Sequence, residues 1–303
     1  MTRTLKTALR QRMLLAGGNL DTALDVQRFD LRRDFFGVAG MGDLLCLSQH
    51  ARVKAALRDF LRSGADVLLT PTRRANPLTL REHDLEDLSF ALNLAAAEAC
   101  VEAVDEEPGL GRRRFVLGVI EDRGWLAEDE DVEAAVREQA EALLAGGVDA
   151  LSLEIWPELG RLKAAFAGAQ RAVEAMESDA PLLLLNRRGS FKAPGAIARR
   201  AGGLVALADA DADESPEALS ELLGEGINLL ACRGGPAAVG ELDRTLRTLA
   251  PDRWRPVTLH GEEQPDDELQ PASSWQWHSP AMRSQRKAWR ATPEAEERQL
   301  QRA

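Results

Sequence analysis

Short apolar runs alternate with longer amphipathic stretches along most of this chain. Residues 67–69 and 182–185 are continuously apolar, which is typical of parallel strands buried on both faces. Residues 50–64 instead repeat their apolar positions at helical spacing and end at a glycine. The pattern predicts strand–helix repeats between about residues 13 and 250, and such repeats form a parallel sheet wrapped by helices.

The repeats predict an α/β fold of the (βα)8 TIM-barrel type, because seven or eight units favour a closed barrel over an open sheet. No GxGxxG sequence supports a dinucleotide-binding fold. Seven strands are clear, and the spacing between residues 187 and 227 is tight, so a complete barrel and one shortened around strand six both stay open. The predicted strands are residues 13–17, 65–70, 115–120, 150–156, 181–186, 204–207 and 227–231. The predicted helices are residues 50–64, 87–104, 132–144, 159–176, 193–200, 215–223 and 236–249.

The composition changes near residue 250. We expect residues 1–250 to form the barrel and residues 251–303 to form an irregular C-terminal tail. The tail is rich in proline and charge and carries four of the six tryptophans, at positions 254, 275, 277 and 289. It is therefore where we expect a contact with a partner or with a second copy of the chain.

The charge balance excludes two classes of partner. The 303 residues carry a formal net charge of -11, whereas nucleic acids and anionic membrane surfaces select basic faces. No apolar run is long enough to cross a bilayer, and the basic start of the chain lacks the apolar stretch of a secretory signal. These observations predict a cytoplasmic protein.

The cysteines offer no recognisable chemical motif by themselves. Cys46, Cys100 and Cys232 are far apart in the chain and odd in number, so they form neither a disulfide framework nor a metal-ligand spacing. Cys46 and Cys100 are expected to be small buried apolar side chains.

Six segments carry recognisable family motifs: residues 42–45 (Gly-Asp-Leu-Leu), 60–70, 88–99, 146–154 (Gly-Gly-Val-Asp-Ala-Leu-Ser-Leu-Glu), 162–165 and 228–235. In this order they resemble the homocysteine S-methyltransferase family, which includes the betaine-dependent enzyme and the homocysteine domain of cobalamin-dependent methionine synthase. The resemblance covers most of residues 13–250 and supports the barrel prediction.

The resemblance implies a zinc ion held by three cysteines, two of them adjacent after the last strand and one at the end of strand six. This chain departs from that pattern. Cys232 is followed by Arg233 and Gly234, and the end of the sixth predicted strand has no cysteine. The aspartate that ends the family's first strand is replaced by Ala16. We therefore predict no cofactor, with Cys232 the only residue near the family's zinc-cysteine position.

Four residues are candidate substrate contacts. Glu154 matches the family residue that holds the amino-acid end of homocysteine, and a salt bridge to an arginine such as Arg187 or Arg233 is an equally weighted alternative. Arg187 follows strand five and suits a carboxylate or phosphate. Thr70 ends the second predicted strand, and Asn19 follows the first one closely.

Two classes of function follow from the resemblance and its departures. One is a divergent, zinc-less family member with little or no thiol methyl transfer, which binds a small amino acid or thiol or acts as a partner subunit. The other is an active S-methyltransferase for a homocysteine-like thiol, or another barrel-mouth enzyme that works without zinc. Whether the chain is an enzyme stays open at this point.

Overall fold

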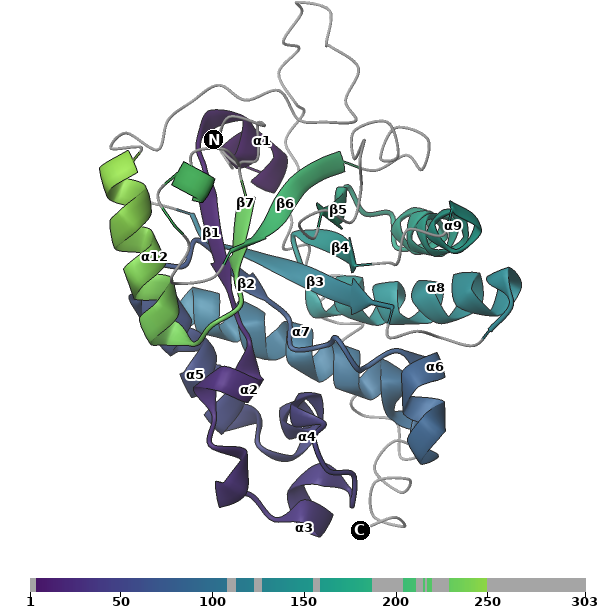
Figure 1. Ribbon diagram of the computed structural model, residues 1–303. Helices are drawn as coiled ribbons and strands as arrows, with labels where there is room; N and C mark the ends of the chain where they lie inside the picture. Colours follow the sequence, from purple (N-terminus) through teal and green to yellow (C-terminus); the bar gives the residue numbers. More distant parts are fainter. Residues whose placement is uncertain are drawn as a thin grey trace, which may run out of the picture. The chain divides into compact units, whose positions relative to one another are not determined.

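The fold is a ring of parallel strands with helices on its outer side (Figure 1). The computed structural model describes residues 4–107, 113–122, 127–154, 159–186, 204–210, 215, 217–219 and 229–249. The strands in this part of the chain are β1 (Leu14–Gly17), β2 (Val67–Leu69), β3 (Phe115–Glu121), β4 (Ala150–Glu154), β5 (Leu182–Asn186), β6 (Leu204–Ala210) and β7 (Leu229–Cys232).

Each described strand is hydrogen bonded to the next one along the chain, and β7 returns to β1. The closing pair aligns Leu14 with Leu229 and Ala16 with Ala231, and every pairing is parallel. Both edges of each of these seven strands are therefore paired, so the ring leaves no open edge among the described residues.

Alternating strand residues face the inside of the ring and form its core. Because neighbouring side chains of a strand point to opposite faces, every second residue reaches the interior. The inward set includes Leu14, Ala16, Val67, Leu69, Phe115, Leu117, Val119, Ala150, Leu183, Leu229 and Ala231, all buried. The other strand face is covered by helices, which explains why the strands are apolar throughout.

Helix α1 (Leu5–Gln11) contributes to the same core and was not predicted from the sequence. Leu5, Ala8 and Leu9 belong to the interior cluster, and the helix lies near the start of β1 (Figure 1). The Thr4 hydroxyl accepts a hydrogen bond from the Thr7 amide and so caps the first turn.

The main outer helices follow their strands as the apolar periodicity predicted. They are α5 (His50–Arg62), α7 (Ser89–Glu106), α8 (Asp129–Gly146), α9 (Leu159–Ala175) and α12 (Pro236–Leu249). Helix α8 begins with three acidic residues, which complement the positive end of its dipole. Gly147 caps its C-terminal end, with a φ of 91° in the left-handed conformation that glycine adopts readily.

The connections after β1 and β2 are long and contain short helices. The first holds α2 (Leu20–Ala23), α3 (Leu31–Phe35) and α4 (Leu45–Ser48), with 3-10 turns at Val26–Arg28 and Gly42–Leu44. The second holds α6 (Pro77–Leu80) and 3-10 turns at Arg81–His83 and Glu86–Leu88. Both connections start at the carboxyl ends of strands, which is where ligand sites lie in parallel barrels.

The structure confirms an α/β fold with a curled parallel sheet of the TIM-barrel type. The five helices and seven strands above agree with the predictions to within a few residues at their ends. The predicted helix at 193–200 lies outside the described residues, as does most of the one at 215–223 and all of the predicted tail at 251–303. No helix in the described part of the chain is both long and apolar enough to cross a membrane.

A candidate ligand site at the barrel mouth

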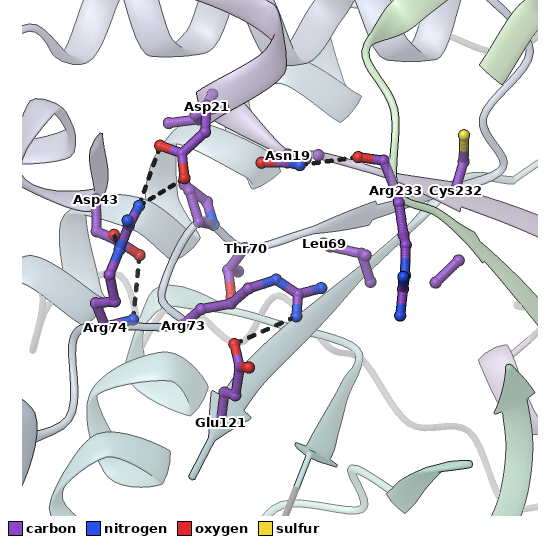
Figure 2. Close-up of a pocket in the computed structure, with 14 residues that line it drawn as sticks. Asn19, Asp21, Asp43, Leu69, Thr70, Arg73, Arg74, Glu121, Cys232 and Arg233 are labelled. Carbon is purple, nitrogen blue, oxygen red and sulfur yellow. Dashed lines mark hydrogen bonds and ion pairs between the residues drawn. The ribbon is translucent and has the colours of Figure 1, made fainter. Parts of the chain in front are cut away.

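A cavity of about 430 Å³ opens at the carboxyl ends of the strands. It is walled by the segments that follow β1, β2 and β7, together with the last residue of β3. Charged side chains of both signs line it (Figure 2). The lining residues are Gly18, Asn19, Leu20, Asp21, Asp43, Leu69, Thr70, Pro71, Arg73, Arg74, Glu121, Ala231, Cys232 and Arg233.

The wall after β1 depends on Gly18 and Asn19. Gly18 has a φ of 149°, and a Cβ at this position would lie 2.3 Å from the carbonyl oxygen of Leu69. Only glycine therefore lets β1 and β2 approach this closely. The Asn19 side chain donates a hydrogen bond of 2.8 Å to the carbonyl of Arg233 (Figure 2). Of the predicted contact residues, Asn19 thus lines the cavity and also ties the end of β1 to the end of β7.

Thr70 lines the cavity too, and its hydroxyl joins the ends of β2 and β3. Its Oγ1 accepts a hydrogen bond of 2.9 Å from the Val119 amide and lies 2.7 Å from Oγ1 of Thr72. Thr72 in turn donates to the Val119 carbonyl. Thr70 as a whole is only 2% exposed. It therefore has a structural role at the place where a ligand contact was predicted.

Glu154 ends β4 next to Glu121, which ends β3, and the two residues are register partners. Their side chains are 0% and 5% exposed. Arg73, from the segment after β2, contacts Glu154, and its Nη1 atom lies 3.7 Å from Oε2 of Glu121. Figure 2 shows the Arg73 guanidinium above Glu121. Glu154 therefore forms a salt bridge, as one of the two sequence interpretations proposed.

The arginine in that salt bridge is different from the two that the sequence suggested. Arg187 lies outside the described residues, and Arg233 lines the cavity from the end of β7. Arg73 was overlooked because sequence spacing does not show how the loop after β2 turns. A usable signal was present, since Arg73 and Arg74 are adjacent basic residues in the short segment that follows the end of β2.

Arg74 pairs with Asp43 and Asp21, which together with Glu121 are the carboxylates that line the cavity. Its Nε lies 2.6 Å from Oδ2 of Asp43, and its Nη2 lies 2.8 Å from Oδ2 of Asp21 (Figure 2). It also contacts the carbonyl of Gly40. Burial lowers the pKa of Arg74, but the two aspartates outweigh that effect and raise it above the ordinary value. Arg74 is therefore a fixed cation that anchors the β1 and β2 connections to each other.

Cys232 is buried at 2% exposure and ends β7. Because Ala231 faces the interior of the ring, its neighbour Cys232 is on the opposite strand face. Figure 2 accordingly shows the Cys232 sulfur pointing away from the contact between Arg73 and Glu121. The thiol is thus turned away from the charged part of the mouth, although the residue contributes to its lining.

The residues present do not fit a zinc site made of three thiolates. The chain has only three cysteines, and Cys46 and Cys100 are buried in α4 and α7, outside the strand ring. Burial raises the pKa of both thiols well above the ordinary value, which disfavours the thiolate form that zinc binds. In the described ranges, no three His, Cys, Asp or Glu side chains are grouped so as to hold a metal ion.

The fold belongs to the class of parallel α/β barrels, in which a polar cavity at the strand ends is the usual place of ligand sites. Within that class, the family model of homocysteine S-methyltransferase matches residues 13–185. The chain therefore belongs to the homocysteine S-methyltransferase family, as the sequence resemblance predicted. The match stops before β6 and β7, so it includes Glu154 and not the segment around Cys232.

Individual relatives agree with this assignment. Methionine synthase of Mycobacterium tuberculosis (strain ATCC 25618 / H37Rv) is 29% identical over 174 residues, which are 56% of this chain and 14% of that protein. This chain thus spans only about a seventh of the length of that relative.

Solved structures of the homocysteine methyltransferase MmuM from Escherichia coli share the fold. The metallated form has a TM-score of 0.61 at 19% identity and covers 80% of this chain and 99% of its own. The apo form has a TM-score of 0.52 at 17% identity and covers 78% of this chain and 96% of its own.

Proposed function

We propose that this chain is a zinc-less member of its family that binds a small polar molecule at the barrel mouth and performs little or no thiol methyl transfer. The observation that carries the proposal is the position of the cysteines. Cys232 is the only cysteine beside the cavity, and the other two are buried in helices outside the ring.

The chemistry of a thiol substrate explains why this observation matters. A free thiol has a pKa of about 8.5 and is mostly protonated at neutral pH, so methyl transfer to sulfur needs a group that stabilises the thiolate. In the family that this chain resembles, a zinc ion held by three cysteines stabilises the thiolate. Here the cavity instead carries Arg73, Arg74 and Arg233 with three carboxylates. Such a lining favours binding and orientation of a charged small molecule, an amino acid or thiol acid being the first candidates.

A barrel shortened around strand six is part of the same proposal. Strand β5 pairs directly with β6, and β6 pairs with β7, before the ring returns to β1. A missing strand–helix unit would remove the strand end that carries the third cysteine in the family pattern. The loss of the third zinc-binding cysteine and the loss of the strand–helix unit would then have been a single event.

Metal analysis and a methyl-transfer assay test the proposal together. The purified chain should hold well below one zinc per polypeptide, and a chelator should leave its melting temperature unchanged. Homocysteine methylation should stay at background with added zinc, while methionine or homocysteine should raise the melting temperature. One tightly bound zinc per chain that is lost in Cys232→Ser would overturn the proposal.

A second candidate, an active enzyme without zinc, draws on the two neighbouring carboxylates Glu121 and Glu154. Buried carboxylates at a strand end can serve as a general base. This alternative predicts turnover in the presence of a chelator that falls at least about tenfold in Glu154→Gln, the usual order for a lost general base.

A further inference from the structure

The carboxylates of Glu121 and Glu154 form a site that requires a cation. They end adjacent parallel strands in register, so both side chains lie on the inner face of the ring. Both are almost completely buried. Two buried carboxylates on paired residues of adjacent strands repel each other strongly. The repulsion falls only if a positive group neutralises them or if one carboxylate is protonated.

The structure supplies that positive group from within the chain. The Arg73 guanidinium reaches both carboxylates through its Nη1 atom. Arg73 lies between the two carboxylates and the cavity, since its side chain is 32% exposed while theirs are at most 5% exposed. It therefore occupies the side of the carboxylates from which a cationic group of a bound ligand would approach them.

We infer that Arg73 is a built-in occupant of a cation site formed by Glu121 and Glu154, and that among small carboxylates it makes the cavity prefer those without an amino group over the matching amino acids. The ligand class rests on the proposed function, namely that the cavity binds a small molecule. An ammonium group in the cavity has either to displace Arg73 or to lie beside a like charge. A ligand carboxylate is instead attracted to the positive charges of Arg73 and Arg233, which both line the cavity.

A simple ammonium ion tests the site without knowledge of the ligand. Arg73→Ala removes the guanidinium, and Arg73→Gln removes the charge but keeps hydrogen-bonding groups near both carboxylates. Each variant and the wild type are titrated with ethylammonium chloride at constant ionic strength, with potassium chloride as the reference salt. Melting temperature and calorimetry report binding.

Arg113→Ala is the matched control. Arg113 is also 32% exposed, and its guanidinium forms a salt bridge to the Asp149 carboxylate, whereas Arg73 contacts two carboxylates. It precedes β3, at the strand end opposite Glu121. The control therefore loses an equivalent charge far from the cavity mouth.

Removal of Arg73 should strengthen ethylammonium binding at least tenfold over the wild type and over Arg113→Ala. Adding Glu154→Gln to Arg73→Gln should abolish the gain, because one carboxylate is then neutral. Equal responses of wild type, Arg73→Gln and Arg73→Ala would overturn the inference. Arg73→Gln decides the question even if Arg73→Ala fails to fold.

Two matched ligands test the selectivity. The wild type should bind 4-(methylthio)butanoate more tightly than methionine, which differs by its amino group, and Arg73→Gln should reverse that order. An unchanged order in Arg73→Gln would contradict the role of Arg73. Wild-type binding of neither compound would count against the proposed ligand site, whereas the ammonium titration judges the cation site separately.

Discussion

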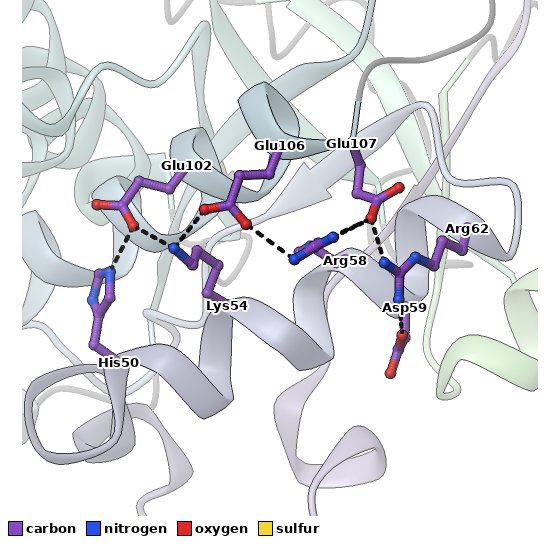
Figure 3. Close-up of polar contacts among 8 residues, drawn as sticks. All are labelled: His50, Lys54, Arg58, Asp59, Arg62, Glu102, Glu106 and Glu107. Atoms are coloured by element: carbon purple, nitrogen blue, oxygen red, sulfur yellow. Dashed lines mark hydrogen bonds and ion pairs between the residues drawn. The ribbon is translucent and has the colours of Figure 1, made fainter.

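The chain contains two networks of ion pairs that use the same residue types in opposite surroundings. At the barrel mouth, Arg73 meets two carboxylates whose side chains are at most 5% exposed. On the outer surface, basic residues of α5 meet acidic residues at the end of α7, with side-chain exposures from 20% to 55% (Figure 3). The outer network joins His50, Lys54, Arg58 and Arg62 to Glu102, Glu106 and Glu107.

The outer network follows directly from helical spacing. Its basic residues recur every four positions and so lie on one face of α5. The distances are short, 2.7 Å from Lys54 to Glu106 and 2.6 Å from Arg58 to Glu107. Hydrogen bonds from Arg58 and Arg62 lower the pKa of Glu107. Water competes for these groups, so each pair contributes little to the free energy of unfolding.

The mouth network behaves differently because its acidic side chains are almost completely buried. Breaking a buried pair leaves an uncompensated charge in a medium of low dielectric constant. The comparison teaches that distance alone does not rank ion pairs in this protein. Burial of the carboxylate decides which arginines the fold depends on.

The largest expected effect is that of Arg73→Ala at the mouth. It removes the Arg73 guanidinium from two neighbouring buried carboxylates and should reduce the free energy of unfolding by about 3–5 kcal/mol at neutral pH. Urea denaturation measures the change. Adding Glu154→Gln should restore part of the loss, and a loss below about 1 kcal/mol would place the mouth in the same class as surface pairs.

Arg74→Ala should have the next largest effect. It unpairs Asp43, which is 4% exposed, and Asp21, which is 48% exposed and can be solvated. We expect a loss of about 1–3 kcal/mol, dominated by the buried carboxylate. Asp21→Asn in urea denaturation is the control, because it should lose much less than Arg74→Ala. Equal losses would show that burial of Asp43 does not matter.

Asp34 tests an intermediate case, a buried carboxylate paired with an exposed arginine. Hydrogen bonding from Arg33, opposed by burial and aided by the Asp30 amide and Gln49, lowers the pKa of Asp34. A lowered folded-state pKa means stability that is complete above the ordinary value of about 3.9 and is lost as the pH falls below it.

The pH dependence of unfolding between pH 7 and pH 2 measures this contribution. Asp34→Asn should flatten the curve below pH 4 relative to the wild type, with Asp25→Asn as the exposed control (Asp25 is 55% exposed and pairs with Arg28). An identical slope in Asp34→Asn and the wild type would refute the assignment.

The smallest effect is expected on the outer helices. Arg58→Ala should change the free energy of unfolding by at most about 1 kcal/mol, and most of that change should vanish in 1 M salt, where the Debye length is about 3 Å. The loss caused by Arg73→Ala should persist in the same salt. A large, salt-resistant loss in Arg58→Ala would erase the difference between the two networks.

The sequence predicted those parts of the fold in which local pattern and tertiary role agree. The continuous apolar runs at residues 67–69 and 182–185 are typical of parallel strands under helices, and both lie in such strands, β2 and β5. Helix α1 was missed because its seven residues are too few for a clear period, while its apolar face is used only once the ring exists.

The position of the candidate site could be predicted from the sequence, but the partners of its side chains could not all be predicted. A carboxylate at the end of β4 was expected at the mouth, and Glu154 is there. Its partner Arg73 depends on the path of a loop, which no periodicity records. The orientation of Cys232 could have been found, because the twofold period of a strand that buries Ala231 inside turns Cys232 outward.

The burial of all three cysteines has a consequence for oxidative conditions. Peroxide and disulfide reagents attack exposed thiolates, and a thiolate-bound metal centre loses its ion when they do. The described mouth presents guanidinium and carboxylate groups, which such reagents leave intact. The ligand binding that we propose for the mouth should therefore continue under oxidative conditions that would inactivate an enzyme dependent on sulfur ligands.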